Sequence, residues 1–304
     1  MFIIYMDRCA PNYADGTVSC FTKDVLIKII GLYNSNYADK IQIGHGANKR
    51  DLWEAIQSKM SKRCGNDETC WIEQGFLKRV QPDLEQYFKP LAPLGRYQWL
   101  STDDINGVMR QYAAKYSDFK FVGPLPIDFM TLRDRESQYL QKLDLNKEAQ
   151  RYRNIGIIFN LDPSTENGSH WVSLNIDLSK KEIHYFDSYG NKTSDPNEFQ
   201  LPYYDSYGVY HREKMIPMPP TIQKFVFHSM KRLISNDFTS NGGVKMPYTL
   251  RINSIQHQYA NSECGIYSML FLLKSRNNSF DQITQDIITD EVANQARNTL
   301  FRRK

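Results

Sequence analysis

Three residues of this 304-residue chain have side chains that work together in acyl-transfer chemistry, namely His170, Asp187 and Cys264. A cysteine thiolate is a strong nucleophile, an imidazole can take its proton, and a carboxylate can orient that imidazole and stabilise its charge. Because an unperturbed cysteine is mostly thiol at neutral pH, such a site also needs a feature that lowers the pKa of the thiol. The order histidine, aspartate, cysteine therefore predicts a thiol protease.

The local sequence explains how the histidine and the aspartate can meet. Residues 170–177 alternate loosely as a strand does, residues 178–181 are polar enough to turn, and residues 182–187 read as a second strand. In a hairpin folded about its centre, His170 lies opposite Asp187, and directly opposed residues are about 4.5–5.5 Å apart at Cβ. We therefore expect this pair to form the orienting half of a hydrolytic triad.

The segment around Cys264 favours an activated cysteine. Polar residues precede it and an apolar helical run follows, so the sulfur falls at an expected helix N-terminus, where N–H groups and the helix dipole favour an anion. Gly265 removes a side chain where a substrate backbone must approach. An oxyanion donor is also needed, and we expect it to be Gln258, with Gln256 as second choice and Asn261 as a weaker candidate.

Each of these residues also has a purely structural interpretation. A cysteine before an apolar helix is most often inert core, a lone histidine is usually a satisfied residue, and a lone aspartate is usually a turn residue. His257 is a rival base, but it neighbours Gln258 on a strand, so the two side chains point to opposite faces. His184 is expected on the other face of its strand. The joint occurrence of the three residues in fitting contexts favours the catalytic interpretation.

The number and spacing of the cysteines bear on disulfides and on metal sites. The chain has five cysteines, Cys9, Cys20, Cys64, Cys70 and Cys264. An odd count without a secretory signal argues against a disulfide framework, and the absence of a CxxC pair argues against structural zinc. We expect Cys64 and Cys70 to be free thiols, with a disulfide or a metal clip as the less favoured alternatives. No cofactor and no metal are expected.

Composition excludes several classes of protein. Hydrophobic residues make up 41% of the chain, with 19 Tyr and 16 Phe, so a large aromatic core is possible. A net charge of +4 gives no strong argument for nucleic-acid binding. No apolar stretch approaches the ~20 residues of a membrane helix, and the apolar start is too short for a signal peptide. We therefore expect a soluble protein made in a cytosol; the sequence is silent on its oligomeric state.

Two domains are expected, a helical arm at 1–94 and a core at 95–304, separated by a cluster of Pro and Gly at 90–95. In the arm, helical spacing occurs at 22–33, 51–60 and 71–80. In the core we expect a helix after Ser101 or Thr102, a strand at 155–161, a loop at 162–169, an irregular stretch at 189–219, a helix at 221–234, a break at 240–243 and a strand at 248–255. Helices flanking a mixed, mainly antiparallel sheet make the class α+β.

These motifs together resemble the Ulp1-like and adenovirus-protease-like cysteine peptidases. The matching motifs are His-Trp at 170–171, Asp-Ser at 187–188, Gln258 followed six residues later by Cys264-Gly265, and a Trp-Leu entry segment at 99–106. The resemblance covers roughly residues 95–304. One departure is Glu263, where the family usually has aspartate before the cysteine. Within the family, the chain is similar to the polyprotein-processing proteases of African swine fever virus and related large DNA viruses.

The resemblance implies a papain-like fold and cleavage after Gly-Gly sites in viral structural polyproteins during particle maturation. It places the protein at the assembly site in the host cytoplasm and in the virion. It also matches Trp99 and Trp171 to two rings that clamp a narrow tunnel, which would admit glycine and exclude any Cβ. Simple core packing of both rings is the alternative.

Other functions are compatible with the same residues. The main alternative is a deconjugase or processing protease for a ubiquitin-like modifier. A cysteine-dependent acetyltransferase is disfavoured because the chain has no obvious Gly-rich phosphate-binding loop, and a silent binding module is disfavoured because His170, Asp187 and Cys264 are all present.

Overall fold

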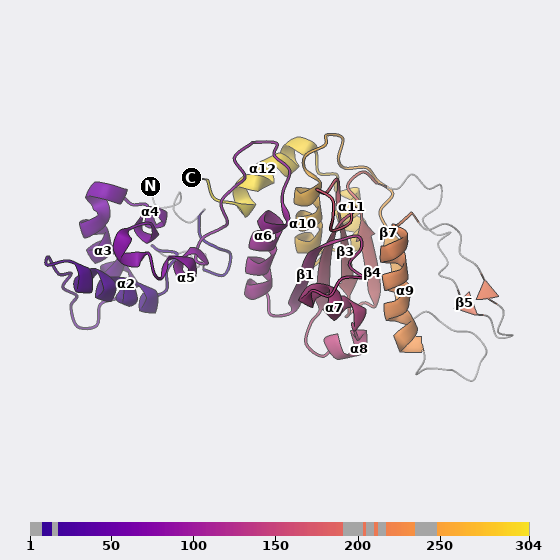
Figure 1. The fold of residues 1–304 in the computed structure, drawn as a ribbon, viewed down its shortest axis with the longest axis horizontal. Coiled ribbons are helices and arrows are strands. Elements are labelled where there is room, and N and C mark those ends of the chain that lie inside the picture. The colour runs from indigo at the N-terminus through magenta and orange to yellow at the C-terminus, as the bar shows by residue number, and fades with distance from the viewer. Residues whose placement is uncertain are drawn as a thin grey trace. The chain divides into compact units, whose positions relative to one another are not determined.

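The computed structural model describes residues 8–13, 18–190, 203–204, 210–211, 217–234 and 248–303. The chain divides into two compact units: an N-terminal unit of residues 1–92, 110–115 and 297–304, and a sheet unit of residues 93–109 and 116–296. Figure 1 labels most of the elements of both. The predicted break at 240–243, most of the predicted irregular stretch at 189–219, and the first seven residues lie outside the described residues. The predicted domain boundary at 94 stays a prediction.

The N-terminal unit is helical, with two helices of 14 and 16 residues followed by shorter ones. These are α2 (Lys23–Asn36), α3 (Lys49–Cys64), α4 (Glu68–Ile72), a 3-10 turn η1 (Gly75–Leu77) and α5 (Gln81–Glu85). The Thr22 side chain caps α2, and Asn48 caps α3 in a capping box with Asp51. The predicted single helix at 71–80 is wrong, because the chain breaks there into short pieces around Gly75, a weak helix former.

All five cysteines lie in the described part of the chain, and four of them are paired. Cys9 bonds to Cys20 and Cys64 to Cys70, with Cα atoms 5.1 and 5.4 Å apart. The expectation of free thiols at 64 and 70, and of no disulfide framework, is therefore wrong. The odd count misled because it included Cys264, which is free; the other four form an even set within one unit.

The remaining elements lie wholly or mainly in the sheet unit; the ends of the first and the last of them, residues 110–115 and 297–300, belong to the N-terminal unit. They are α6 (Thr102–Lys115), β1 (Phe119–Pro126), α7 (Arg135–Gln141), α8 (Leu145–Glu148), β2 (Asn154–Asn160), β3 (Trp171–Asp177), β4 (Glu182–Phe186), β5 (Tyr203–Tyr204), β6 (Tyr210–His211), α9 (Pro220–Ile234), β7 (Thr249–Ile252), α10 (Cys264–Lys274), α11 (Phe280–Gln285) and α12 (Asp290–Leu300). The predicted helices and strands are thus present, although the last strand is shorter than expected. The residues that follow β7 form the approach to Cys264.

Five strands form one mixed sheet in the order β1-β2-β3-β4-β7. The β1–β2 and β4–β7 pairs are parallel, whereas β2–β3 and β3–β4 are antiparallel, as is the separate β5–β6 pair. This arrangement confirms the α+β class. Because β4 and β7 are parallel, both strands end at the same end of the sheet, so the residues that follow them are neighbours.

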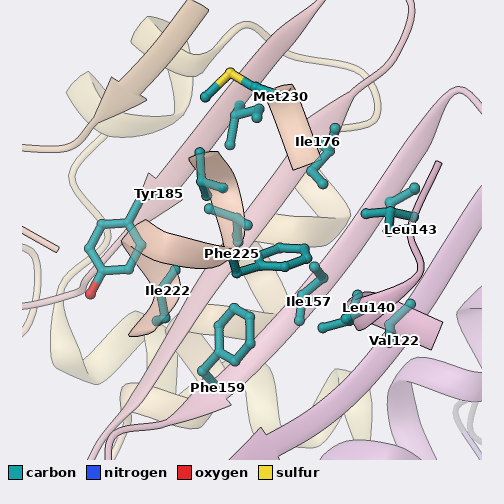
Figure 2. Close-up of a cluster of buried hydrophobic side chains, with 14 of the residues drawn as sticks. Val122, Leu140, Leu143, Ile157, Phe159, Ile176, Tyr185, Ile222, Phe225 and Met230 are labelled. Atoms are coloured by element: carbon teal, nitrogen blue, oxygen red, sulfur yellow. The ribbon is translucent and has the colours of Figure 1, made fainter. Parts of the chain in front are cut away.

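The two faces of the sheet are covered by different helices. On one face, α9 packs Ile222 and Phe225 against strand residues that include Ile157 and Phe159, as Figure 2 shows. On the other face, α10 lies against β3 and β2, and the rings of Phe186 and Phe271 stack 4.6 Å apart. Burial on both faces fixes the register of the strands, because a one-residue slip would exchange the faces.

The predicted β3–β4 hairpin is confirmed, with a register that differs by two residues from the expected one. Asp177 pairs with Glu182, and continuing this register would set Asp187 opposite Val172 instead of opposite His170. An even offset keeps the side chains on the same side of the hairpin. The histidine and the aspartate are therefore diagonal neighbours.

Candidate active site

His170 and Asp187 meet just beyond the open end of the β3–β4 hairpin. The Nε2 atom of His170 lies 2.8 Å from Oδ1 of Asp187, and 12% and 16% of the two side chains are exposed. Because Nε2 faces the carboxylate, Nδ1 is the ring nitrogen left to face a nucleophile. The pair that the sequence predicts is therefore formed, and it is mostly shielded from water.

The pKa of His170 is raised to about 9, from an ordinary value of 6.5. Burial opposes this shift, because desolvation disfavours the charged ring. Hydrogen bonds to Asp187 and to Cys264, together with the negative charge of both partners, outweigh the burial. The ring is therefore an imidazolium at neutral pH, which is the partner that a thiolate needs.

Asp187 is held in place through its backbone. Its N–H donates to Oδ1 of Asn253 at 2.9 Å, and Nδ2 of Asn253 donates back to the Asp187 carbonyl at 2.9 Å. Asn253 is buried directly after β7, so this reciprocal pair joins the ends of the parallel strands β4 and β7. Asn253 was not predicted from the sequence; its signal is an asparagine directly following a short strand.

Cys264 is the first residue of α10, and its side chain is buried. The residue before it, Glu263, occupies the N-cap position without making a side-chain cap. The carboxylate of Glu263 instead accepts hydrogen bonds from Ser262 and from Asn294, at 3.1 and 2.9 Å. The Glu263 side chain therefore does not cap the first N–H groups of α10, and N–H groups at a helix start are oriented to stabilise a negative charge.

The Gln258 side chain is fully buried and has a fixed orientation. Its Oε1 accepts a hydrogen bond from the Ser188 hydroxyl at 2.6 Å, which directs Nε2 the other way. There Nε2 donates to the Ala260 carbonyl at 2.7 Å and lies 3.5 Å from the Tyr189 hydroxyl. The longer contact is weak, so one N–H of this amide is only loosely engaged.

The other two amides are placed differently. Nε2 of Gln256 donates to the backbone carbonyl of Gln258 at 2.8 Å, so this side chain supports the loop before the cysteine. Asn261 is exposed. Of the three amides, Gln258 alone is buried with its orientation set by a second side chain.

Tyr189 is a site residue that sequence analysis did not identify. Its ring stacks on the His170 ring, with centroids 4.8 Å apart and planes 27° apart. Its N–H donates to Oδ1 of Asp187 at 3.0 Å, and its hydroxyl donates to the Ala260 carbonyl at 3.3 Å. The residue thus touches the histidine, the aspartate and the loop that carries Gln258. Its position two residues after the aspartate is the signal that could have found it.

The other two histidines near the hairpin are structural. Both ring nitrogens of buried His257 are engaged, Nε2 with the Thr284 carbonyl at 3.1 Å and Nδ1 with the Ile288 N–H at 3.3 Å. Burial lowers the pKa of His257, so it is a neutral core residue. His184 is likewise buried and bonds to Glu182 at 2.8 Å.

A groove of about 550 Å³ adjoins the site, and we call it the loop groove. It is lined by the neighbours of His170 in sequence, Ser169 and Trp171, and by Trp99, while His170 itself and Cys264 do not line it. Trp99 is 46% exposed, whereas Trp171 is 7% exposed. Both tryptophans are thus at one groove, one as an exposed ring and the other as part of its wall.

The space beside Gly265 is filled by the protein. A Cβ there would lie 3.1 Å from Leu100 and 3.3 Å from Trp171, and the Trp171 indole N–H donates to the Leu100 carbonyl at 3.0 Å. The expected open approach for a substrate at Gly265 therefore needs correction. This glycine lets the start of α10 pack closely against two residues of the groove wall.

A free sulfur at a helix start that faces an imidazolium can attack a carbonyl carbon as a thiolate, and the Gln258 amide can stabilise an oxyanion. Among the described residues, no group of three His, Cys, Asp or Glu side chains could hold a metal ion. In the same part of the chain, no helix is long and apolar enough to cross a bilayer.

This fold and this arrangement of residues define a cysteine peptidase, and comparison with known sequences agrees. Residues 152–303 match the profile of the Ulp1 protease family, C-terminal catalytic domain. The chain belongs to the Ulp1 protease family.

Viral proteins are among its relatives. A protein of Acanthamoeba polyphaga mimivirus, named as a thiol protease, is 26% identical over 317 residues, covering 98% of this chain and 94% of that protein. The SUMO-1 cysteine protease of African swine fever virus is 25% identical over 279 residues, covering 84% of this chain and 89% of that protein.

Solved structures show the same fold. Two crystal structures of the African swine fever virus protease match with TM-scores of 0.57 and 0.59, at 18% and 19% identity. Each comparison covers 98% of this chain, and 96% or 97% of the viral chain. The family and the fold expected from the sequence are thus confirmed.

Proposed function

We propose that Cys264, His170 and Asp187 are the catalytic triad of a protease, with Gln258 as oxyanion donor. The observation that carries this proposal is the position of the His170 ring, which lies 2.8 Å from Asp187 on one side and hydrogen-bonds to Cys264 on the other. Neither His257 nor His184 offers such an arrangement, because their ring nitrogens are engaged elsewhere.

The reaction follows from these positions. The Cys264 thiolate attacks the scissile carbonyl carbon, a C–S bond forms, and the carbonyl electrons move to oxygen, where Gln258 and the N–H groups of α10 stabilise the negative charge. The C–N bond then breaks as the His170 imidazolium protonates the leaving amine. Water, deprotonated by neutral His170, hydrolyses the thioester and releases the carboxylic acid and the cysteine.

The proposed substrates are viral structural polyproteins, cleaved after Gly-Gly at the assembly site in the host cytoplasm and in the virion. The viral relatives support this choice. Trp99 and Trp171, which line the loop groove, are proposed to clamp the two glycines. Trp99→Ala should then raise cleavage of Ala-Ala peptides relative to Gly-Gly peptides; an unchanged ratio would show that the clamp is wrong.

A deconjugase or processing protease for a ubiquitin-like modifier is the second candidate. The name of the swine fever virus relative, a SUMO-1 cysteine protease, favours it. Incubating the protein with a panel of structural polyproteins and modifier precursors, and sequencing the new termini, separates the two candidates. Cleavage confined to modifier precursors would select the deconjugase.

We also propose that residues 1–94 form an arm domain that recognises substrate or scaffold proteins, and that residues 95–304 form the peptidase core. Limited proteolysis tests this boundary: cutting is expected first between residues 90 and 95. Stable fragments that begin or end elsewhere would place the boundary differently.

A further inference from the structure

The loop groove is acidic. Among the sixteen residues that line it, all of them described, Asp103, Asp162 and Glu166 carry carboxylates, and none is a lysine, arginine or histidine. The chain as a whole has a net charge of +4. The groove therefore has a charge opposite to that of the whole protein, which favours a cationic ligand.

A buried amide lies in the wall of the same groove. Asn160, at the end of β2, is 9% exposed, and its Oδ1 accepts the backbone N–H of Asp162 at 3.0 Å and of Ser169 at 3.3 Å. These two bonds fix the amide orientation and turn Nδ2 the other way. There, among the described residues, Nδ2 has no hydrogen-bond partner within the protein.

Gly168 explains why the amide can take this position. Its φ is +88°, and a Cβ on it would collide with Nδ2 of Asn160. Only glycine fits beneath the amide without strain. The donor is therefore held over a backbone that leaves it room, within a groove that a ligand can enter.

The loop of residues 162–169, which carries Asp162 and Glu166, is held in place before any ligand binds. The N–H and hydroxyl of Ser164 donate to the carboxylate of Asp128 at 2.9 and 2.7 Å. The Ser169 hydroxyl donates to Asp162 at 2.7 Å. These bonds anchor both ends of the loop, so binding here does not require the loop to become ordered first.

We propose that the loop groove binds the substrate residues that precede the cleaved dipeptide and selects a lysine or arginine among them. Nδ2 of Asn160 donates to a backbone carbonyl of the extended peptide, which supplies affinity without sequence preference. Asp162 and Glu166 supply the charge preference. The inference depends on the proposed function, because it places the dipeptide at Trp99 and Trp171, which line the same groove.

A metal ion is a poorer occupant than a cationic side chain. No group of three potential metal-binding side chains occurs in the described part of the chain. A hard cation such as Ca²⁺ takes six to eight oxygen ligands. A lysine or arginine side chain needs only one or two carboxylates and can bring its own backbone to the Asn160 donor.

The test uses the full-length protein and fluorogenic peptides that end in Gly-Gly, with Lys, Gln or Glu placed in turn at each of the four preceding positions. At one position or more, kcat/KM is expected to fall from Lys to Gln to Glu, by about tenfold overall. The ratio should shrink in about 0.5 M salt, since screening weakens exposed ion pairs.

Variants of the exposed Glu166 test whether this residue causes the preference for lysine over glutamate. Glu166→Gln should reduce the Lys-to-Glu ratio several-fold, and Glu166→Lys should reduce it further, with Asp103 and Asp162 still in place. Asp83→Asn, which removes the same charge from α5 in the N-terminal unit, is the matched control and should leave the ratio unchanged. A ratio that falls equally in the control would assign the preference to overall charge and overturn the inference.

Asn160→Asp tests the donor. The new side chain keeps an oxygen for the two backbone N–H groups and replaces the free donor with an acceptor. For the Gln peptides, KM should rise about tenfold with kcat little changed. An unchanged KM would overturn the role of Asn160, and the Glu166 series stands independently should this variant fold poorly.

Different results would overturn the proposed protease function and the charge preference of the loop groove. If no Gly-Gly peptide is cleaved, or cleavage survives Cys264→Ala, the proposed function is wrong. If cleavage depends on Cys264 but shows no charge preference at any of the four positions, only the present inference is overturned.

Discussion

The two units use cysteine in opposite ways. In the N-terminal unit, four cysteines form two disulfides between segments close in sequence. In the sheet unit, Cys264 stays free at the start of a helix, beside a charged imidazole. Sulfur therefore stabilises structure in one unit, and in the other it is available for chemistry.

The difference follows from what holds each unit together. The N-terminal unit has a buried core of its own, which includes Phe21, Leu26 and Trp71, but it is the smaller of the two units, and a smaller unit gains more from covalent links. The sheet unit has a continuous core between its strands and α9 (Figure 2), with Phe159, Phe225 and Ile222 fully buried, and needs no such link. A cysteine in the sheet unit can therefore stay reduced without loss of stability.

The largest expected effect tests whether reactivity belongs to the sheet unit alone. Cys264→Ala should lower peptide cleavage by about 10⁴-fold or more, because the nucleophile is lost, and should abolish labelling by a thiol-reactive substrate mimic. Cys64→Ala and Cys70→Ala should leave the labelling intact. Mass spectrometry of the labelled protein checks this, and a label that persists without Cys264 would refute the assignment.

Asp187→Asn comes next, with an expected loss in kcat of about 10²- to 10⁴-fold. Since Asp187 helps to raise the pKa of His170 to about 9, the alkaline limb of the activity profile should move to lower pH in the variant. Steady-state kinetics over a range of pH measures both effects. A limb that stays in place would mean that the aspartate does not control the histidine.

The same pKa shift predicts how stability depends on pH. The folded pKa of His170, about 9, lies above its ordinary value of 6.5, so the ion pair stabilises the fold fully below pH 6.5. That contribution is lost as the pH rises through about 9. Urea unfolding at several pH values should show this loss in the wild type and a smaller loss in Asp187→Asn.

Reducing the disulfides has a smaller effect, and in the other unit. The bridges span 11 and 6 residues, so each should contribute about 2–3 kcal/mol to the unfolding free energy. Denaturant unfolding with and without dithiothreitol measures this contribution, with labelling of Cys264 followed in parallel. If reduction left stability unchanged, the contrast between the units would lose its physical basis.

The smallest effect concerns Tyr189. Tyr189→Phe keeps the ring on His170 and removes the hydroxyl that bonds to Ala260, so kcat/KM should fall only a few-fold. Tyr189→Ala also removes the ring, and a stacked ring stabilises a cation, so its alkaline limb should move to lower pH. Equal pH profiles for the two variants would assign Tyr189 to packing alone.

Much of this arrangement is visible in the sequence because short-range signals carry it. The hairpin follows from alternation and a polar turn, and the position of Cys264 follows from an apolar run after polar residues. The predicted β3–β4 register differs from the observed one by two residues. Alternation determines which face each side chain occupies, but it does not determine which residue lies opposite on the neighbouring strand. In the sheet unit, the same signals predicted α6, β2, β3, β4, α9, β7 and α10, whereas β1, α7, α8, α11 and α12 were not predicted.

The parts that the sequence did not reveal depend on contacts between distant segments. Asn253 holds Asp187 across 66 positions, and Ser188 orients Gln258 across 70. No local pattern shows which distant partner each of these side chains bonds to. The disulfides were missed for a related reason: whether two sulfurs meet is decided by how the helices pack, and a count of cysteines says nothing about packing.

The parallel pairing of β4 and β7 has a consequence for how this enzyme can change. Both strands end at the same end of the sheet, and the hydrogen bonds between Asp187 and Asn253 join those ends. The spacing of Asp187 and Asn253 therefore does not depend on the length of the chain that joins them. Insertions or reporter tags on either side of α9 should therefore be tolerated, provided that the helix stays docked. Diversity can accumulate in that connection while the chemistry is conserved.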